Sequence, residues 1–314
     1  MTLTADPAPR TSPRESVYRP RRPLDLMATV GVLQRGRRDP TMAVDGSVIW
    51  MALRTEAGVA TLALRTAPGE VRATAWGPGA AEALARVPRI CGADDDPTGF
   101  DPSSHPLLAA TARRCPGLRL TRTDAVFEAL AGAIIEQKVT GMQAYGAWRL
   151  LVARYGAPAP GPVPRPLFAA PAAEEWRRIP SWAWQRAGVQ PPQSRTVVRV
   201  AERAPSIVRA VLAAGDGASR EAALTSLPGI GPWTSAETRI RALGDPDAVS
   251  AGDYHLAHEV GYALTGSRTD DAGMLELLAP WAGHRQRVVR LIRASGAVEP
   301  RRGPRLAPED HRDR

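Results

Sequence analysis

Two glycines flanking one apolar residue mark the most distinctive stretch of the sequence, Leu227–Trp233 (LPGIGPW). Because glycine has no Cβ, such a stretch turns tightly and lets the backbone approach a ligand. The residues that follow predict an amphipathic helix, whose first N–H groups are free and carry the positive end of its dipole. The stretch therefore predicts an anion site with Ile230 as its apolar anchor, and on a basic protein the expected anion is a nucleic-acid phosphate.

One aspartate, Asp253, follows the second glycine of this turn by 22 residues. A carboxylate near a reacting centre stabilises a developing positive charge and orients or deprotonates a water molecule. The same residue stands directly before Tyr254-His255-Leu256, where an aspartate would cap the start of a helix. The two interpretations are compatible, and the sequence leaves both open.

The turn, the aspartate at this spacing and the later Pro280-Trp281 together resemble the helix–hairpin–helix DNA glycosylases, in particular the bacterial 3-methyladenine DNA glycosylase II branch. The resemblance covers roughly residues 25–294. It implies an α+β fold, with a small antiparallel β N-terminal domain followed by an all-α helix–hairpin–helix glycosylase domain. It also implies base flipping in duplex DNA and cleavage of the N-glycosidic bond, with Asp253 stabilising the oxocarbenium-like sugar.

The resemblance implies a base pocket formed by Trp233, Glu237, Tyr254 and Trp281. An alkylated purine is cationic and already a good leaving group, so aromatic faces suit it better than a general acid does. Each aromatic residue taken alone is explained as well by a place in the core. Glu237 departs from the aromatic residue of the best-known relative, and a carboxylate there would attract a cationic base or hydrogen-bond a neutral one.

DNA contacts are implied at a further set of positions. Lys138, the only lysine, stands where relatives often carry an apolar wedge, so a phosphate or base-edge contact is expected instead. An ordinary exposed lysine is the alternative. For Arg285, as for the neighbouring Arg287 and Arg290, the alternative is a solvated helix face. The complete set is Gln137, Lys138, Gly229, Ile230, Gly231, Thr234, His255 and Arg285.

The resemblance also predicts a monofunctional enzyme. Glycosylases that cut the strand use a lysine two residues after the second hairpin glycine to form a Schiff base, and Trp233 occupies that position here. The product would be an abasic site without a nick. No convincing set of metal ligands is visible and no organic cofactor is implied, although the resemblance allows a monovalent cation at the hairpin carbonyls.

Composition favours a polyanionic partner, because the 314 residues carry a formal net charge of +9 and the pI is about 10.6. Two cysteines are too few for a four-cysteine iron–sulfur cluster and argue against a disulfide-rich secreted protein. No apolar run approaches the ~20 residues that span a bilayer. We expect a cytoplasmic, nucleoid-associated monomer that binds double-stranded DNA, without a membrane or an obligate protein partner.

The pattern of residues predicts how these positions are carried. Strands are expected at Ser47–Leu53, Gly58–Thr66 and Glu70–Gly77, and a helix at Ala80–Arg86. Residues 25–104 would form the β-rich domain and 105–298 the helical domain, interrupted by a proline-rich connector over 156–171. We expect disordered tails at 1–24 and 299–314, and a solvated loop at the acidic run 94–96.

Two rival functions remain open. A non-catalytic DNA-binding protein could keep the hairpin and lose turnover, which Glu237 and Lys138 favour and Asp253 disfavours. A glycosylase for a deaminated or oxidised base is the other, and the chemistry around Glu237 would decide it.

Overall fold

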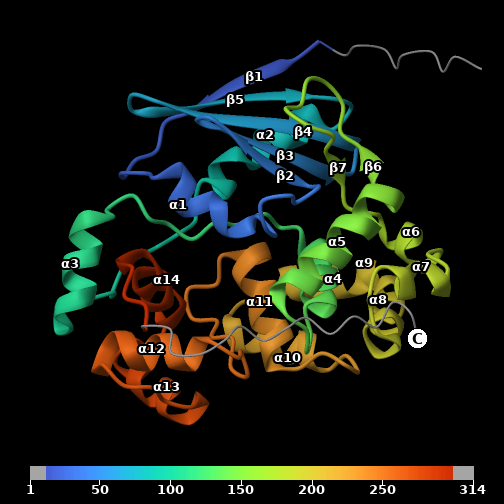
Figure 1. The fold of residues 1–314 in the computed structure, drawn as a ribbon. Coiled ribbons are helices and arrows are strands. Elements are labelled where there is room, and N and C mark those ends of the chain that lie inside the picture. Colours follow the sequence, from blue (N-terminus) through green and yellow to red (C-terminus); the bar gives the residue numbers. More distant parts are fainter. Residues whose placement is uncertain (1–11, 300–314) are drawn as a thin grey trace, which may run out of the picture.

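The N-terminal part of the chain is a five-stranded antiparallel sheet, seen in a computed structural model that describes residues 12–299 (Figure 1). The strands expected from the alternating pattern are confirmed as three neighbouring hairpin-linked strands at the centre of this sheet. The spatial order is β1-β5-β4-β3-β2, with β1 at Arg14–Tyr18, β2 at Met42–Asp45, β3 at Val48–Thr55, β4 at Gly58–Ala67 and β5 at Glu70–Trp76.

One face of the sheet is covered by α2 (Ala80–Ile90), which contacts β1, β4 and β5. Its buried residues Ala83, Val87 and Ile90 recur at helical spacing and pack against apolar strand residues such as Leu62 and Leu64. The helix predicted over 80–86 is confirmed in place and runs four residues further. A short helix, α1 (Leu26–Val30), adds to the same core.

The expected disordered tail over residues 1–24 is wrong for its second half. Residues 14–18 form β1, which pairs with β5 from Arg14 opposite Ala75 to Tyr18 opposite Val71. Proline and arginine dominate this segment's composition, but the edge of β5 pairs with it, so that Ser16 and Tyr18 become half-buried while Glu15 and Val17 stay exposed. Residues 1–11 and 300–314 lie outside the described residues, so the expectations for them stay predictions.

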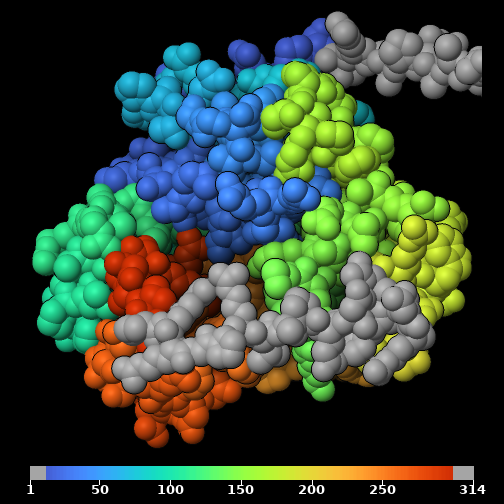
Figure 2. Space-filling model, in the orientation of Figure 1, coloured from blue at the N-terminus to red at the C-terminus, as the bar shows by residue number. Residues whose placement is uncertain are grey.

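The rest of the described chain is mainly helical, and Figure 2 shows the C-terminal helices (orange to red) beneath the sheet and beside α3. Residues 191–213 form two helices, α8 and α9, because Pro205, two residues after the break at Arg203, has no N–H with which to continue the first helix. The helices are α3 Pro106–Arg114, α4 Val126–Ile135, α5 Gly141–Tyr155, α6 Ala173–Arg177, α7 Ser181–Arg186, α8 Pro191–Glu202, α9 Ala204–Ala213, α10 Gly217–Thr225, α11 Pro232–Leu243, α12 Leu256–Thr265, α13 Asp271–Leu278 and α14 Arg285–Ser295.

The proline-rich connector carries structure of its own. It contains the short strands β6 (Ala157–Pro158) and β7 (Phe168–Ala169), and β7 lies against β3 (Figure 1). Arg165 donates to the carbonyl oxygens of Asp39 and Met42, at 2.6 and 2.7 Å. The connector therefore ties the sheet to the helices rather than spacing them apart.

The helical part is organised around α11, which packs against α4 and α10. Eight of its twelve residues are buried and three more are half-buried, so that only Pro232 is exposed. Such a helix holds its N-terminus in one place, which matters because the glycine turn leads into it. Within residues 12–299, no helix combines the length and apolar character needed to cross a membrane.

Candidate DNA-binding and catalytic site

The glycine turn joins α10 to α11 as a tight hairpin. Gly229 has a φ of +88°, and a Cβ there would come within 2.7 Å of the Thr196 hydroxyl, so both conformation and space require glycine. A Cβ on Gly231 would meet open space instead. Ile230, only 5 % exposed, anchors the turn in the core as predicted. The outer side of the turn is thus accessible, and the N-terminus of α11 follows it directly.

Asp253 lies in the loop between α11 and α12 and uses both of its carboxylate oxygens. Oδ1 accepts the backbone N–H groups of His255 and Leu256, at 2.9 and 3.0 Å, so the predicted cap of the next helix is present. Oδ2 accepts the indole N–H of Trp233 at 3.2 Å. The structure therefore brings together Asp253 and Trp233, two of the residues that the sequence singled out. The side chain is only partly buried, so it keeps access to solvent.

Glu237 follows Trp233 by one turn of α11 and is held by two partners. Its Oε1 accepts the Ser250 hydroxyl at 2.5 Å, and its Oε2 accepts a hydrogen bond from Arg241. Burial acts to raise the pKa of this carboxyl, but the Arg241 charge and the Ser250 hydrogen bond outweigh burial and lower it. Glu237 is therefore ionised at neutral pH.

Arg241 continues this charge network toward the sheet. One of its nitrogens lies 4.0 Å from Glu136 at the end of α4, and Glu136 in turn accepts from Arg35 Nε at 2.9 Å. The Arg35 side chain is buried and stacks over Trp148, with its guanidinium 4.7 Å from the ring centre. Alternating charges thus link the N-terminal part of the chain, α4 and α11.

The loop between α4 and α5 lies against the hairpin. Gln137 Nε2 donates to the carbonyl oxygen of Gly229 at 2.9 Å and to the hydroxyl of Thr234 at 2.8 Å. Three residues predicted to contact DNA are thereby brought together, but the Gln137 amide group serves the protein itself. Lys138, the next residue, is exposed and has a φ of +55°, which is rare for a residue with a side chain.

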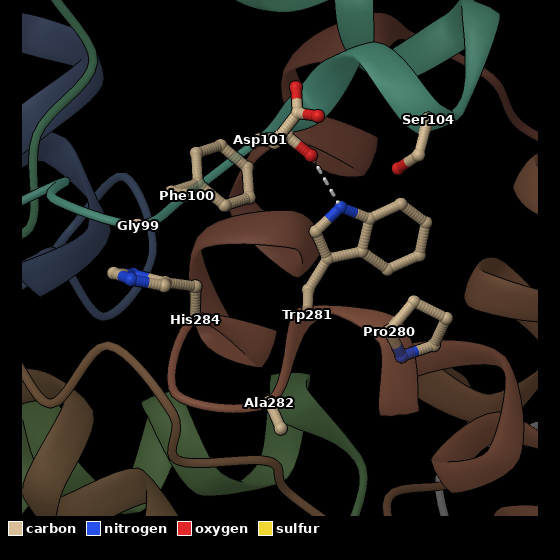
Figure 3. A pocket seen from close by; sticks show the side chains of 8 residues that line it. All are labelled: Gly99, Phe100, Asp101, Ser104, Pro280, Trp281, Ala282 and His284. Atoms are coloured by element: carbon tan, nitrogen blue, oxygen red, sulfur yellow. Dashed lines mark hydrogen bonds between the residues drawn. The ribbon is translucent and has the colours of Figure 1, made fainter.

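Tyr254 and Trp281, the other predicted pocket residues, lie in contrasting surroundings. Tyr254 is 75 % exposed and contacts the His255 ring edge-on at 4.8 Å. Trp281 is 8 % exposed, donates its N–H to the Asp101 carbonyl at 2.8 Å, and lines a cavity of about 230 Å³ together with Phe100 and others (Figure 3). Trp233, Glu237 and Tyr254 do not line that cavity.

The arginines of α14 are engaged within the protein. Arg285 forms a two-pronged pair with Asp247, at 2.8 and 2.5 Å. Arg287 is buried and paired with Asp95, at 3.0 and 2.6 Å. The solvated loop expected at 94–96 is therefore wrong for Asp95, and the solvated helix face is wrong for Arg287, because each neutralises the other across the fold.

The amino-acid sequence is similar to that of a curated DNA repair protein. Over 178 residues the chain is 33 % identical to a probable bifunctional transcriptional activator/DNA repair enzyme AlkA of Mycobacterium tuberculosis. That match takes in 55 % of this chain and 35 % of the relative, so the chain spans about a third of the length of the curated relatives it matches. No protein-family model matches.

Superposition on solved structures identifies the fold of this chain. A 3-methyladenine DNA glycosylase from Archaeoglobus fulgidus superposes with a TM-score of 0.74 at 15 % identity, over 89 % of this chain and 98 % of that one. The apo form of an 8-oxoguanine glycosylase/lyase from Clostridium acetobutylicum reaches 0.70 at 10 % identity, over 91 % and 98 %. This is the helix–hairpin–helix DNA glycosylase fold.

The expected resemblance and the α+β fold class are thereby confirmed, and the match to AlkA supports the 3-methyladenine branch. Sequence reasoning missed the residues that hold Glu237 and the α4–α5 loop in place, namely Ser250 and Arg241 for Glu237 and Gln193 for the loop. A glutamine and a serine carry no signal by type, since their partners lie far away in the chain. Arg241 follows Glu237 by four residues, a spacing that does predict an ion pair on a helix.

Two hairpin carbonyls bear on the monovalent cation that the resemblance allows. Arg199 donates to the Pro228 carbonyl at 3.3 Å, and Gln137 donates to that of Gly229. A guanidinium beside one of them places positive charge where a cation would need oxygen ligands, so these two carbonyls do not fit it. Among the described residues, no cluster of three or more histidine, cysteine or acidic side chains suits a metal either.

Proposed function

We propose that this chain is a monofunctional DNA glycosylase that excises damaged, alkylated purines from duplex DNA and leaves an abasic site. The observation that carries the proposal is the carboxylate of Asp253, joined to Trp233 beside the glycine hairpin. The glycosylase fold and the partial identity to a DNA repair enzyme support the reaction class. Activity as a monomer without a protein partner, on DNA in the cytoplasm, is part of the same proposal.

The chemistry follows from where the charges lie. The target nucleotide leaves the stack, and its glycosidic bond breaks with positive charge developing on the sugar. The Asp253 side chain stabilises that charge and orients water toward the sugar carbon. The indole N–H of Trp233 and the helix cap fix the carboxylate, so little reorganisation accompanies the reaction.

The charge of Glu237 supports an alkylated substrate. An ionised carboxylate one turn from Trp233 favours a cationic base over a neutral one of the same shape. Arg241 offsets part of this charge, so the preference is one of degree. A glycosylase for oxidised or deaminated bases is the second candidate. The fold shared with an 8-oxoguanine glycosylase/lyase is the reason to include such lesions in the experiment.

Strand cutting is not part of the proposal. It requires an amine near the sugar, and Trp233 stands at the position of the expected lysine. The only lysine, Lys138, lies in the exposed α4–α5 loop, outside the hairpin helix. The side chain that would form a Schiff base is therefore missing from that helix.

The test uses duplexes that each carry one defined lesion: 3-methyladenine or a stable analogue, 7-methylguanine, hypoxanthine or 8-oxoguanine. We expect alkali-dependent cleavage of the alkylated duplexes, and a loss of at least ~100-fold in the single-turnover rate of Asp253→Asn, since general-base groups contribute about 10²–10⁴. Asparagine still caps α12, so the variant should fold. Asp270→Asn, which changes the cap of α13 instead, is the matched control.

Other outcomes separate the rivals. Tight binding without base release from any lesion would establish the non-catalytic protein. Release of 8-oxoguanine or hypoxanthine alone would show that the substrates are oxidised or deaminated bases rather than alkylated ones. Cleavage before alkali would overturn the monofunctional assignment.

A further inference from the structure

Helix α8 lies behind both loops that face the proposed DNA site. Three of its residues, at intervals of three, reach them: Gln193 contacts the α4–α5 loop, Thr196 abuts Gly229, and Arg199 bonds to Pro228. Residues at this spacing share one face of a helix. One face of α8 therefore supports the hairpin and the loop that carries Lys138.

Gln193 makes the contact with the loop. It is 5 % exposed, and its Nε2 donates to the carbonyl oxygens of Ile135 and Gln137, at 3.0 and 2.7 Å. Its Oε1 accepts the backbone N–H of Gln190 at 2.9 Å and so caps the start of α8. The oxygen of this amide group thus caps α8, while its nitrogen binds the α4–α5 loop. Without that nitrogen, the carbonyl groups of Ile135 and Gln137 would lose a hydrogen-bond donor, which would lower the stability of the loop.

Gln137 extends the contact to the hairpin. Its backbone accepts from Gln193 while its side chain donates to Gly229 and Thr234. The two glutamines form a relay from α8 through the loop to the hairpin. Directly after this relay stands Lys138, exposed and in the left-handed region. Such a conformation is strained for a residue with a side chain and persists only where neighbours hold it.

We propose that Gln193 is a positioning residue: through Gln137 it holds Lys138 in the conformation that enters damaged DNA, and it fixes the loop relative to the hairpin. The proposal rests on the proposed function for its DNA part only. Both loops then meet the duplex as one rigid unit, which lowers the ordering cost of binding. No contact between Gln193 and DNA is needed.

The sequence offers a readout of the loop that needs no DNA. Lys138 is the only lysine, so a lysine-specific endoprotease can cut the intact chain only there. We expect slow cleavage of the wild type. Gln193→Glu keeps the oxygen that caps α8 but loses both donors, and should be cut about tenfold faster, as loss of roughly 1.4 kcal/mol of local stability predicts. Ser194→Ala, which removes a hydroxyl that bonds to the Pro191 carbonyl at the same helix end, is the matched control.

Binding to a duplex with a tetrahydrofuran abasic analogue gives the second readout. Gln193→Glu should weaken binding to this duplex by about the factor by which it speeds proteolytic cleavage at Lys138. In a Lys138→Ala background the same substitution should have little effect on binding, because two residues that act through one contact are not additive. Gln137→Met tests the other half of the relay if Gln193→Glu fails to fold, as judged by its thermal midpoint.

The outcomes are distinct. Unchanged cleavage in folded Gln193 and Gln137 variants would refute the proposal, as would a binding loss that persists in full beside Lys138→Ala. If the wild type releases no base from any lesion, the glycosylase assignment fails while both of these readouts still decide the role of Gln193.

Discussion

Glu237 brings a fixed charge to the predicted base pocket, and its neighbours determine how that charge acts. Ser250 and Arg241 occupy its two oxygens, so it is held as a carboxylate and has little freedom to turn toward a base. Its influence on a flipped base is thus mainly electrostatic. The sequence left open whether Glu237 attracts a cationic base or hydrogen-bonds a neutral one, and this geometry favours attraction.

Replacement of this charge should change selectivity more than overall activity. We expect Glu237→Gln to lower the rate on cationic 7-methylguanine about tenfold and that on neutral hypoxanthine less than about threefold, the scale of one partly screened charge interaction. Single-turnover rates on matched duplexes measure both. Glu259→Gln, in an exposed pair with Arg293, is the control. Equal losses on both lesions would indicate a packing role instead.

Glu128 on α4 gives the protein a dependence on pH. It lines a small cavity of about 40 Å³ with Arg35 and Arg241, and burial raises its pKa from 4.5 to about 7. Between pH 4.5 and 7 the folded protein keeps a proton that the unfolded chain has lost, so stability falls as pH rises through this window. Below pH 4.5 Glu128 is protonated in both the folded and the unfolded chain, and above pH 7 the loss of stability from its buried charge is constant.

Glu128→Gln should remove that cost. Because glutamine mimics the protonated acid, we expect the variant to exceed the wild type in unfolding free energy by on the order of 1–3 kcal/mol at pH 8 and to match it near pH 4.5. Urea unfolding at both pH values provides the measurement. A gain that is the same at both would mean that charge is not its cause.

At the scale of elements, the two hairpin glycines do different work. Gly229 is required inside the protein, by its positive φ and its contact with Thr196, whereas Gly231 has ordinary backbone angles and open space around its Cβ position. The sequence motif marks both alike. Only the folded structure separates the glycine that shapes the turn from the one that leaves room for a ligand.

Alanine at each position should therefore give opposite results. Gly229→Ala should lower the unfolding free energy by about 1–3 kcal/mol, from backbone strain and the clash. Gly231→Ala should leave the thermal midpoint within a few degrees, yet weaken binding to an abasic-analogue duplex about tenfold, since its methyl group occupies the approach of a phosphate. Unimpaired binding by folded Gly231→Ala would place the DNA elsewhere.

Prediction from sequence succeeded where the signal is local. Strands β3 to β5 are short apolar and β-branched runs between turn residues, α2 repeats at helical spacing, and the glycine hairpin and the cap formed by Asp253 follow each other within one stretch. It failed where the partner is remote or the composition misleads. The strand β1 is hidden in a basic, proline-rich segment, and only the neighbouring β5 edge makes it a strand.

The whole molecule is held by charges that join distant parts of the chain. Arg285 pairs with Asp247, and Arg35 joins the N-terminal part to α4 through Glu136. Many of the arginines counted in the sequence thus form ion pairs within the protein. Internal pairing leaves the net charge of +9 unchanged, but it means that the number of arginines overstates how many can bind phosphate. We therefore expect the exposed Lys138 to affect the salt dependence of DNA binding more than Arg285 does.

The pair of Asp95 with Arg287 is the most deeply buried of these links, joining the loop after α2 to α14. The two residues are 192 positions apart, and the acidic run around Asp95 has the composition of a solvated loop, so no local pattern reveals the pairing. Arg287 also lies over the Phe100 ring at 5.7 Å, next to the cavity lined by Trp281. The link therefore bears on both stability and the shape of that cavity.

Removal of one partner should cost more than removal of both. Asp95→Asn leaves a buried guanidinium without its counter-charge, and we expect a loss of about 3–5 kcal/mol in unfolding free energy. Asp95→Asn combined with Arg287→Met removes the stranded charge and should recover part of that loss. Chemical denaturation of the single and double variants completes the cycle, with Asp94→Asn, an exposed neighbour, as control. If the two single losses simply add, the pair is not a coupled unit, and the link between the β domain and α14 must come from apolar packing around Phe100.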